Sequence, residues 1–331
     1  MHWTSLFPLA CVLIAGCASG SATAVSTTLI QVADVPLPGG TSRFDYQSLD
    51  PKSGILYLSH MGDGELLAFD THTRTVIGRL TGFPGITGVL AITSLGKVYC
   101  SVPGANEVDV VDEYSFKKLA GLPADGFADG LAYAPTTGKL FVSDENTGRE
   151  MVIDTKKGRL LVRVSLGGET GNTQYDPGSG HILANLQTLG EIVELDPDSG
   201  AVLARHHLEG GRHPHGLLVD AVNRLAFVAC EGNAKLLVVD LKDFHVRQIL
   251  DTGDDPDVLS MDPGLGRLYV ACEGNILSVF SLKDRHLAKL EDARAGEHCH
   301  SVCVDPATHL LYLPLQNVGG GPVLRIMRPT Q

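Results

Sequence analysis

A strand-forming phrase recurs at an almost constant interval along the chain. It combines a turn that begins with Asp-Pro or a related pair, a glycine and a short apolar strand, as in Leu268-Tyr269-Val270-Ala271 after Asp262 and Pro263. The first turn residues of the copies lie at positions 50, 93, 134, 176, 220, 262 and 305, so the intervals run from 41 to 44 residues. Self-similarity with a period of roughly 20–50 residues indicates a repeat architecture. Seven copies predict seven structural units.

Each repeat contains four short strand patterns. In the fifth copy they cover residues 216–220, 225–230, 236–240 and 246–250. These runs are rich in Val and Leu and are bounded by Gly, Asp and Asn, which is typical of strands and turns rather than helices. Four strands in each unit of this length indicate the blade of a β-propeller. The sequence therefore predicts an all-β fold, a seven-bladed β-propeller of four-stranded blades.

The two ends of the repeat region predict how the ring closes. The last copy has a third strand at residues 323–327 and no fourth, whereas residues 29–33 form a strand pattern ahead of the first copy. Without a partner, the first and last blades would expose strand edges. We expect the N-terminal strand to complete the last blade and close a propeller domain that spans residues 27–331.

The strand Leu268-Tyr269-Val270-Ala271, the Asp-Pro-x-x-Gly turn and the glycine-rich segments ahead of the blades resemble the YVTN-repeat family of seven-bladed propellers, which are WD40-like in architecture. The resemblance covers essentially the whole repeat region. It implies the fold but little about function, because the residues that build blades carry no chemistry.

The first residues have the layout of an export signal. Residues 6–15 form an apolar run too short to span a bilayer, and Leu13-Ile14-Ala15-Gly16-Cys17 resembles a bacterial lipobox. We expect a signal peptide at 1–16, lipidation of Cys17 and a flexible tether at 17–26. The protein would be exported, held at the periplasmic side or the outer membrane by its lipid alone. The alternative is signal cleavage after Ala22-Thr23-Ala24, which leaves a soluble secreted protein.

The net charge limits the classes of partner that we expect. The formal net charge is -12 and no basic run is present, which excludes nucleic acid as an expected partner because phosphate binding needs clustered Lys and Arg.

Five cysteines fall in the repeat region, and Cys230 and Cys272 occupy the same position of successive copies. A bridge between these two is one interpretation; small buried thiols are the one we favour. We expect a monomer.

Polar residues concentrate where the innermost strands of a propeller begin. One ring of aligned positions contains Asp45, Gly88, Asp129, Gly171, His215, Asp257 and His300. Two residues earlier, on the same side of an extended chain, a second ring adds Arg43, His213, Asp255 and His298, whereas Ile86 and Phe127 make the opposite sector apolar. A few convergent polar groups against an apolar wall are typical of a ligand pocket. The predicted ligand-binding residues are Arg43, Asp45, Asp129, His213, His215, Asp255, Asp257, His298 and His300.

Three interpretations of this face stay open. The first expectation is a scaffold that binds a small molecule or a protein partner without turnover. A divalent metal such as Zn, Cu or Mg, held by His215, Asp257 and His300, is the second. The third is a metal-dependent lyase or lactone hydrolase that uses His213, His215, Asp257, His298 and His300, in outline similar to streptogramin lyases; no catalytic residue is assigned. Loops between second and third strands add to the face His60, Asp63, Asp144, Glu145, Glu231 and Glu273.

The lipobox predicts that one cysteine determines membrane attachment. Replacement Cys17→Ser should abolish incorporation of radiolabelled palmitate and move the protein from the membrane fraction to the soluble fraction. The matched control is Cys11→Ser, a change within the apolar run, which should keep the label. Equal labelling of wild type and Cys17→Ser would contradict the lipoprotein interpretation.

Overall fold

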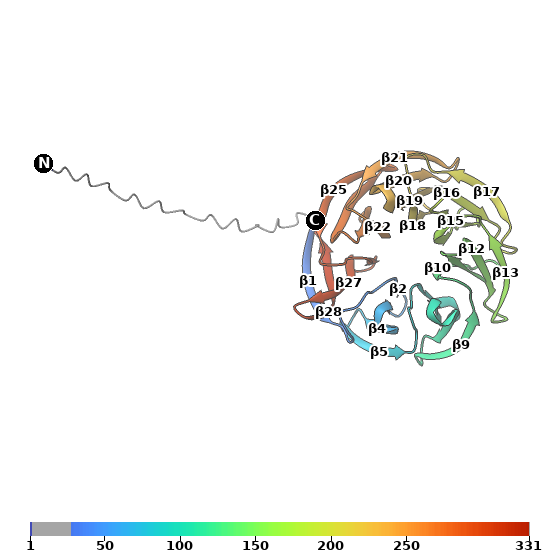
Figure 1. Cartoon of the computed structure of the whole chain (residues 1–331), viewed down its shortest axis with the longest axis horizontal. Helices are drawn as coiled ribbons and strands as arrows, with labels where there is room; N and C mark the ends of the chain where they lie inside the picture. Colours follow the sequence, from blue (N-terminus) through green and yellow to red (C-terminus); the bar gives the residue numbers. More distant parts are fainter. Residues whose placement is uncertain (2–27, 331) are drawn as a thin grey trace.

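The computed structural model describes Met1 and residues 28–330 of the chain. In this part, 28 β-strands form seven four-stranded antiparallel sheets arranged as a closed ring (Figure 1). The seven-bladed, all-β prediction is confirmed. The expected signal peptide, Cys17 and the tether fall outside the described residues. No helix in the described part is long and apolar enough to cross a membrane.

The first strand of each blade lies nearest the centre of the ring and the fourth at its rim (Figure 1). Blade 1 contains β2 (Gln47–Asp50), β3 (Ile55–His60), β4 (Glu65–Asp70) and β5 (Thr75–Thr81). Blade 2 contains β6 (Val89–Ile92), β7 (Lys97–Val102), β8 (Glu107–Asp112) and β9 (Lys117–Pro123). Blade 3 contains β10 (Ala128–Ala134), β11 (Lys139–Asp144), β12 (Arg149–Asp154) and β13 (Arg159–Ser165). Blades 4 and 5 contain β14 (Thr170–Tyr175), β15 (Ile182–Leu186), β16 (Glu191–Leu195) and β17 (Val202–His207); β18 (Pro214–Asp220), β19 (Leu225–Cys230), β20 (Lys235–Asp240) and β21 (His245–Asp251).

Blade 6 contains β22 (Pro256–Asp262), β23 (Arg267–Cys272), β24 (Ile276–Lys283) and β25 (His286–Arg294), and blade 7 contains β26 (Cys303–Asp305), β27 (Leu310–Val318), β28 (Gly321–Pro329) and β1 (Leu29–Pro36). Four 3₁₀ turns also occur in the described part: η1 (Met61–Asp63), η2 (Thr93–Leu95), η3 (Pro103–Ala105) and η4 (Glu231–Asn233).

The aspartate that opens five of the seven repeat turns has a local role. The carboxylate of Asp176 accepts hydrogen bonds from the backbone N–H of Gly178 at 2.8 Å and of Ser179 at 3.2 Å. Asp50 makes the same bonds to Lys52 and Ser53. Such Asx turns fix the reversal between the first and second strands. The recurring Asp-Pro pair is therefore turn chemistry, as its spacing indicates.

One large apolar side chain from each second strand is buried between adjacent blades. These side chains are at most 1% exposed and are Tyr57, Tyr99, Phe141, Leu183, Phe227, Tyr269 and Tyr312. Each belongs to a cluster that also contains residues of the following blade; Tyr269, for example, packs with Leu311 and Leu313 of blade 7. The core is thus a circle of seven interfaces between blades, and no blade covers its own faces.

The ring closes through the N-terminal strand, as the sequence predicts. β1 pairs antiparallel with β28, from Leu29 opposite Pro329 to Pro36 opposite Val323. In Figure 1 the first strand (blue) lies along the outer edge of the last blade (red). Across this pairing, the Arg325 guanidinium donates two hydrogen bonds to Asp34, at 2.8 and 2.7 Å. The two ends of the repeat region are therefore held by both backbone and side-chain bonds.

All five cysteines in the described part are free, and all except the half-buried Cys303 are buried. Cys230 and Cys272 are each completely buried in the packing around their strands. No bridge joins them, so the favoured interpretation, small buried thiols, is the one the structure has. Burial raises the pKa of both thiols to about 12, which keeps them protonated and unreactive.

Replacement Arg325→Met should weaken the closure of the ring. It leaves the largely buried Asp34 carboxylate without its bidentate partner, and the loss should lower the free energy of unfolding by about 2 kcal/mol. Urea denaturation followed by circular dichroism measures this change. The control is Lys235→Met, which removes an ion pair with the exposed Asp251 and should cost at most about 1 kcal/mol. Equal effects of the two changes would show that the Arg325 pair does not stabilise closure.

Candidate functional site

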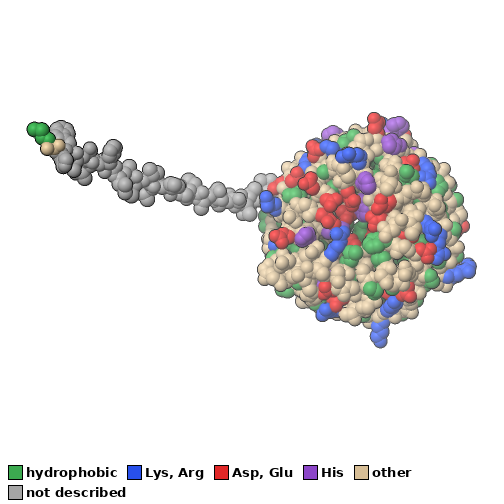
Figure 2. All heavy atoms as spheres, viewed as in Figure 1, with side chains coloured by type: hydrophobic (Ala, Val, Ile, Leu, Met, Phe, Trp, Pro, Cys, Tyr) green, Lys and Arg blue, Asp and Glu red, His purple; other side chains and the backbone are tan. Residues whose placement is uncertain are grey.

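A cavity of about 320 Å³ opens at the mouth of the central tunnel. It contains seven carboxylates, three basic side chains and three others, and its lining residues are Arg43, Asp45, Tyr46, Met61, Phe127, Asp129, Glu145, His215, Glu231, Asp255, Asp257, Glu273 and His300. In Figure 2, acidic side chains gather around the central hollow, with basic and hydrophobic side chains beside them. The tunnel-mouth face predicted from the repeats therefore contains an acidic pocket.

Seven of the nine predicted ligand-binding residues line this cavity: Arg43, Asp45, Asp129, His215, Asp255, Asp257 and His300. They meet because β10, β18 and β22 all begin at the tunnel mouth, and the segments before β2 and β26 reach the same place. At the equivalent position of blade 2 the residue is Gly88, because the packing leaves no room for a side chain. A Cβ there would lie 2.1 Å from the carbonyl oxygen of Asp129.

His213 and His298 are exposed and are not among the cavity-lining residues. We expect them beside His215 and His300 only if the backbone between them is extended. Instead, His213 has φ 49° and His298 has φ 54°, and Asp255 at the same repeat position has φ 57°. A left-handed residue breaks the alternation of an extended strand, so these positions do not follow the side-by-side rule. Asp255 shares this backbone conformation and still lines the cavity, so the conformation alone does not decide which side chains enter it.

Three glutamates complete the pocket from the turns after the second strands. Glu145, Glu231 and Glu273 each follow a ring residue by sixteen positions, namely Asp129, His215 and Asp257. The hairpins bring each pair back together, since Pro214 lies opposite Cys230 and Pro256 opposite Cys272. The sequence places these glutamates on the correct face. The sixteen-residue spacing is the signal that would have assigned them to the pocket itself.

His300 is fully engaged by carboxylates. Its Nε2 lies 2.7 Å from Asp45 Oδ1 and its Nδ1 lies 2.9 Å from Glu273 Oε1 and 3.1 Å from Asp257 Oδ2. Burial alone would lower the pKa of this imidazole, but the carboxylates of Asp257 and Asp45 outweigh burial and hold the pKa well above its usual value.

His215 lies near three carboxylates but is not hydrogen-bonded to any of them. Its Nε2 lies 3.4 Å from Asp257 Oδ1, and its Nδ1 lies 3.7 Å from Glu231 Oε1 and 3.9 Å from Glu145 Oε1. Burial lowers its pKa, but Asp257 and Glu231 more than offset that effect, and the pKa rises to about 9. The Nδ1 of His215 and the Oδ1 of Asp257 have no hydrogen-bond partner in the described part of the chain.

Tyr46 is a site residue that the repeat pattern did not single out. Its hydroxyl lies 2.7 Å from Asn172 Oδ1, 3.2 Å from Asp129 Oδ2 and 3.2 Å from His215 Nε2. One residue of blade 1 thus contacts blades 3, 4 and 5 across the tunnel. It also lines a deeper cavity of about 180 Å³, so it forms the floor of the pocket. The sequence does not show which inner-strand side chain crosses the tunnel.

The pocket has more negative charge than its basic groups neutralise. Burial raises the pKa of Asp129 to about 8, with a further contribution from Asp45. Burial likewise raises the pKa of Glu231 to about 7. Only Glu273 departs in the other direction, to about 2, because it accepts a hydrogen bond from His300 and pairs with Arg43, whose Nη1 lies 2.8 Å away. The carboxylates near His215 are therefore the ones that lack a cation.

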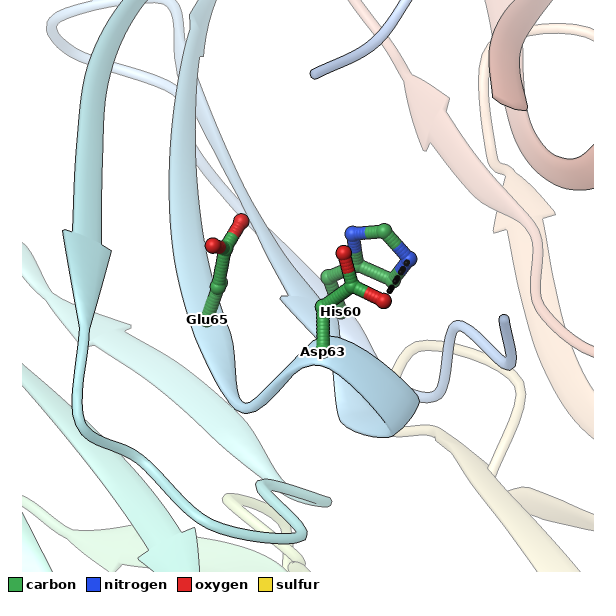
Figure 3. A group of neighbouring side chains, drawn as sticks. All are labelled: His60, Asp63 and Glu65. Carbon is green, nitrogen blue, oxygen red and sulfur yellow. Dashed lines mark ion pairs between the residues drawn. The ribbon is translucent and has the colours of Figure 1, made fainter. Parts of the chain in front are cut away.

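A second histidine–carboxylate group lies in blade 1, formed by His60, Asp63 and Glu65 (Figure 3). Each of its carboxylates already has partners. Arg79 donates to both oxygens of Glu65, at 2.8 and 2.6 Å, and Ser42 donates to Asp63 while also bonding His60 Nε2 at 3.0 Å. These bonds fix the segment that leads into blade 1. We therefore interpret this group as structural.

Comparison with known proteins identifies the class of fold. The chain superposes on a chain of hydrazine synthase from Kuenenia stuttgartiensis with a TM-score of 0.73, at 15% identity over 94% of this chain and 99% of that one. It also matches U3-55K (TM-score 0.75, 8% identity, 90% and 98% covered) and the WD40 repeats of RRP9 (0.76, 7%, 93% and 99%). No protein-family model and no curated protein matches the sequence. The chain is a seven-bladed β-propeller.

Replacement Asp129→Asn should stabilise the protein, and more so at higher pH. In the folded chain Asp129 keeps its proton up to about pH 8, whereas the unfolded chain loses it near pH 4. The unfolded state therefore binds fewer protons between these values, and the free energy of unfolding contributed by Asp129 falls as pH rises. Asn cannot ionise, and its oxygen can still accept the Tyr46 hydrogen bond.

Urea denaturation at pH 5 and pH 8 measures this difference. At pH 8 the variant should be more stable by roughly 2 kcal/mol or more, since one pKa unit corresponds to about 1.4 kcal/mol, and at pH 5 the gain should be smaller. The control is Asp251→Asn on the exposed rim, which should show no such gain. A stability gain that is independent of pH would mean that the Asp129 carboxyl is not held protonated by the fold.

Proposed function

We propose that this propeller is a recognition protein whose tunnel-mouth pocket binds a small cationic ligand. The observation that carries the proposal is the excess of acidic over basic residues around one cavity: seven Asp and Glu side chains line it together with Arg43, His215 and His300. A recessed cavity of about 320 Å³ suits a small ligand better than a flat protein surface does. Met61 and Phe127 give the pocket an apolar side.

Electrostatics support a cation as the missing partner. The raised pKa values of Asp129 and Glu231 mean that burial and neighbouring charges disfavour their ionised forms. A cation within about 4–6 Å stabilises ionised carboxylates and lowers their pKa. A positively charged ligand would therefore gain from every carboxylate on the His215 side, whereas an anion would be repelled.

Acid–base catalysis by the two imidazoles has less support. Neighbouring carboxylates outweigh the effect of burial and raise the pKa of both imidazoles, that of His215 to about 9. A general base must be able to accept a proton near the working pH. Binding without turnover therefore agrees better with the pocket than a lyase or lactone hydrolase does.

The setting of this activity is part of the proposal. We take the protein to be exported and anchored through Cys17; the resemblance to YVTN-repeat propellers concerns the fold and adds nothing about the ligand. The propellers on which the chain superposes share its fold alone, at 15% identity or less, and lend no ligand. Nucleic acid is not the proposed partner, in line with the net charge of -12.

A thermal-shift and calorimetric screen at low ionic strength tests the proposal. The probes are putrescine and spermidine as organic cations, the chlorides of Zn, Mn and Mg, and succinate and phosphate as anions. We expect at least one cation class to raise Tm, because a ligand of the folded state stabilises it by mass action, and the anions to have no effect.

The variant Glu231→Gln removes one pocket charge at a half-buried turn and should weaken the cation effect, whereas Asp251→Asn on the exposed rim should leave it unchanged. If no cation shifts Tm or binds, or if succinate or phosphate binds in preference, the proposed function is wrong.

A further inference from the structure

We propose that His215, Glu231 and Asp257 form a binding site for one divalent transition-metal ion. The proposal rests on the proposed function, because it names the cation. One nitrogen of His215 and one oxygen from each carboxylate lie within 4.8 Å of one another. His215 faces the two carboxylates through different ring nitrogens, since Nε2 lies 3.4 Å from Asp257 Oδ1 and Nδ1 lies 3.7 Å from Glu231 Oε1.

These separations are longer than good hydrogen bonds, so neither carboxylate is hydrogen-bonded to His215. Nitrogen and oxygen ligands lie about 2.0–2.2 Å from Zn²⁺, so two ligands of a tetrahedral site are ~3.4 Å apart. A histidine paired with a carboxylate for stability would bond at about 2.7–2.9 Å. An ion can bind only one of the two nitrogens of His215, and its ligands would be that nitrogen and one oxygen from each carboxylate, all within 4.8 Å of one another.

Two atoms of the triad are buried without a partner. His215 is 7% exposed and Asp257 is 5% exposed, and both line the cavity. The Nδ1 of His215 and the Oδ1 of Asp257 accept or donate no hydrogen bond in the described part of the chain. Buried polar atoms are normally bonded. A metal ion in the cavity would supply what these atoms lack.

His300 has a different part in this arrangement. Sequence spacing predicts His215, Asp257 and His300 as ligands, but His300 is bonded to Asp45 at 2.7 Å and to Glu273 at 2.9 Å. Arg43 also contacts Glu273 at 2.8 Å, so that side of the pocket already has its cations. The geometry points to Glu231 as the third ligand in place of His300.

The remaining contact of His300 positions a ligand. Its Nδ1 lies 3.1 Å from Asp257 Oδ2, the oxygen that does not approach His215. Groups that bond the outer atom of a metal ligand fix its direction and tune its affinity. His300 is thus a positioning residue that presents Asp257 Oδ1 to the ion.

The donor set selects the class of ion. One imidazole nitrogen and two carboxylate oxygens suit Zn²⁺ or Mn²⁺, whereas Mg²⁺ prefers oxygen ligands and water. Glu145, with Oε1 3.9 Å from His215 Nδ1, is positioned to add a fourth donor. Three protein ligands with a further position open to a cavity are the arrangement in which a bound metal keeps room for a small molecule.

Metal binding to the purified full-length protein tests the site. After treatment with EDTA and dialysis, ZnCl₂ and MnCl₂ are titrated by calorimetry, and bound metal is counted by mass spectrometry. We expect one ion per chain. His215→Gln, Glu231→Gln and Asp257→Asn should each weaken binding by more than about 100-fold, beyond the loss of about 10- to 100-fold expected for the positioning variant His300→Gln.

The matched control is Asp63→Asn, in the structural histidine–carboxylate group of blade 1, which should leave metal affinity unchanged. Circular dichroism and thermal unfolding confirm that each variant folds; Glu231→Gln, at the surface turn η4, is the variant least prone to unfold. Metal binding that survives Glu231→Gln but is lost in His300→Gln would overturn the assignment in favour of the His300 triad.

Failure of this inference is separable from failure of the proposed function. If putrescine or spermidine binds in the pocket while neither Zn²⁺ nor Mn²⁺ does, the metal site is wrong and the cationic-ligand proposal stands. If neither metals nor amines bind, both are wrong. Tight metal binding that is lost in Asp63→Asn and kept in the three triad variants would place the ion in blade 1 and overturn the inference alone.

Discussion

Each blade of this ring covers its apolar faces only because another blade stands against it on either side. The side chains that make this contact come from one position of the second strand, and they are completely or almost completely buried. Because the interfaces run in a circle, the last one must join β27 and β28 to blade 1, through residues such as Tyr312 and Phe69. Closure by β1 is therefore required for the whole core and not only for the last blade.

The same circular packing creates the pocket. Inner strands that begin at equivalent positions converge, so that residues more than 250 positions apart, such as Asp45 and His300, come within 2.7 Å. Burial, together with the neighbouring carboxylates of the same cavity, raises the pKa of Asp129 and Glu231, so their ionised forms are disfavoured there. Proteins keep such strain at sites of function. The rest of the ring, with its bonded turns and filled interfaces, is stable enough to hold it.

Within the pocket the two histidines differ although their repeat positions are the same. His300 lies between Asp45, Asp257 and Glu273 at bonding distances. His215 has Tyr46 below it and carboxylates 3.4 to 3.9 Å away. Their neighbours from other blades differ: Glu273, beside His300, also pairs with Arg43 at 2.8 Å, whereas among the residues that line the cavity Glu231 has only His215 as a basic neighbour, at 3.7 Å. On the His300 side of the pocket the imidazole has its carboxylate partners at bonding distance, whereas on the His215 side it does not.

The sequence by itself determined the period, the number of blades, the closure strand and the face on which the ring residues meet. Turn residues and the alternation of strand side chains act locally, and each blade repeats them. The spacing of these signals along the chain is therefore enough to predict the blades and their order. Only the tertiary structure decided that His213 and His298 lie outside the pocket while Asp255, at the same repeat position, lines it, and that Tyr46 crosses the tunnel floor. It also decided which imidazole is saturated, because that depends on side-chain distances between blades, which no interval along the chain encodes.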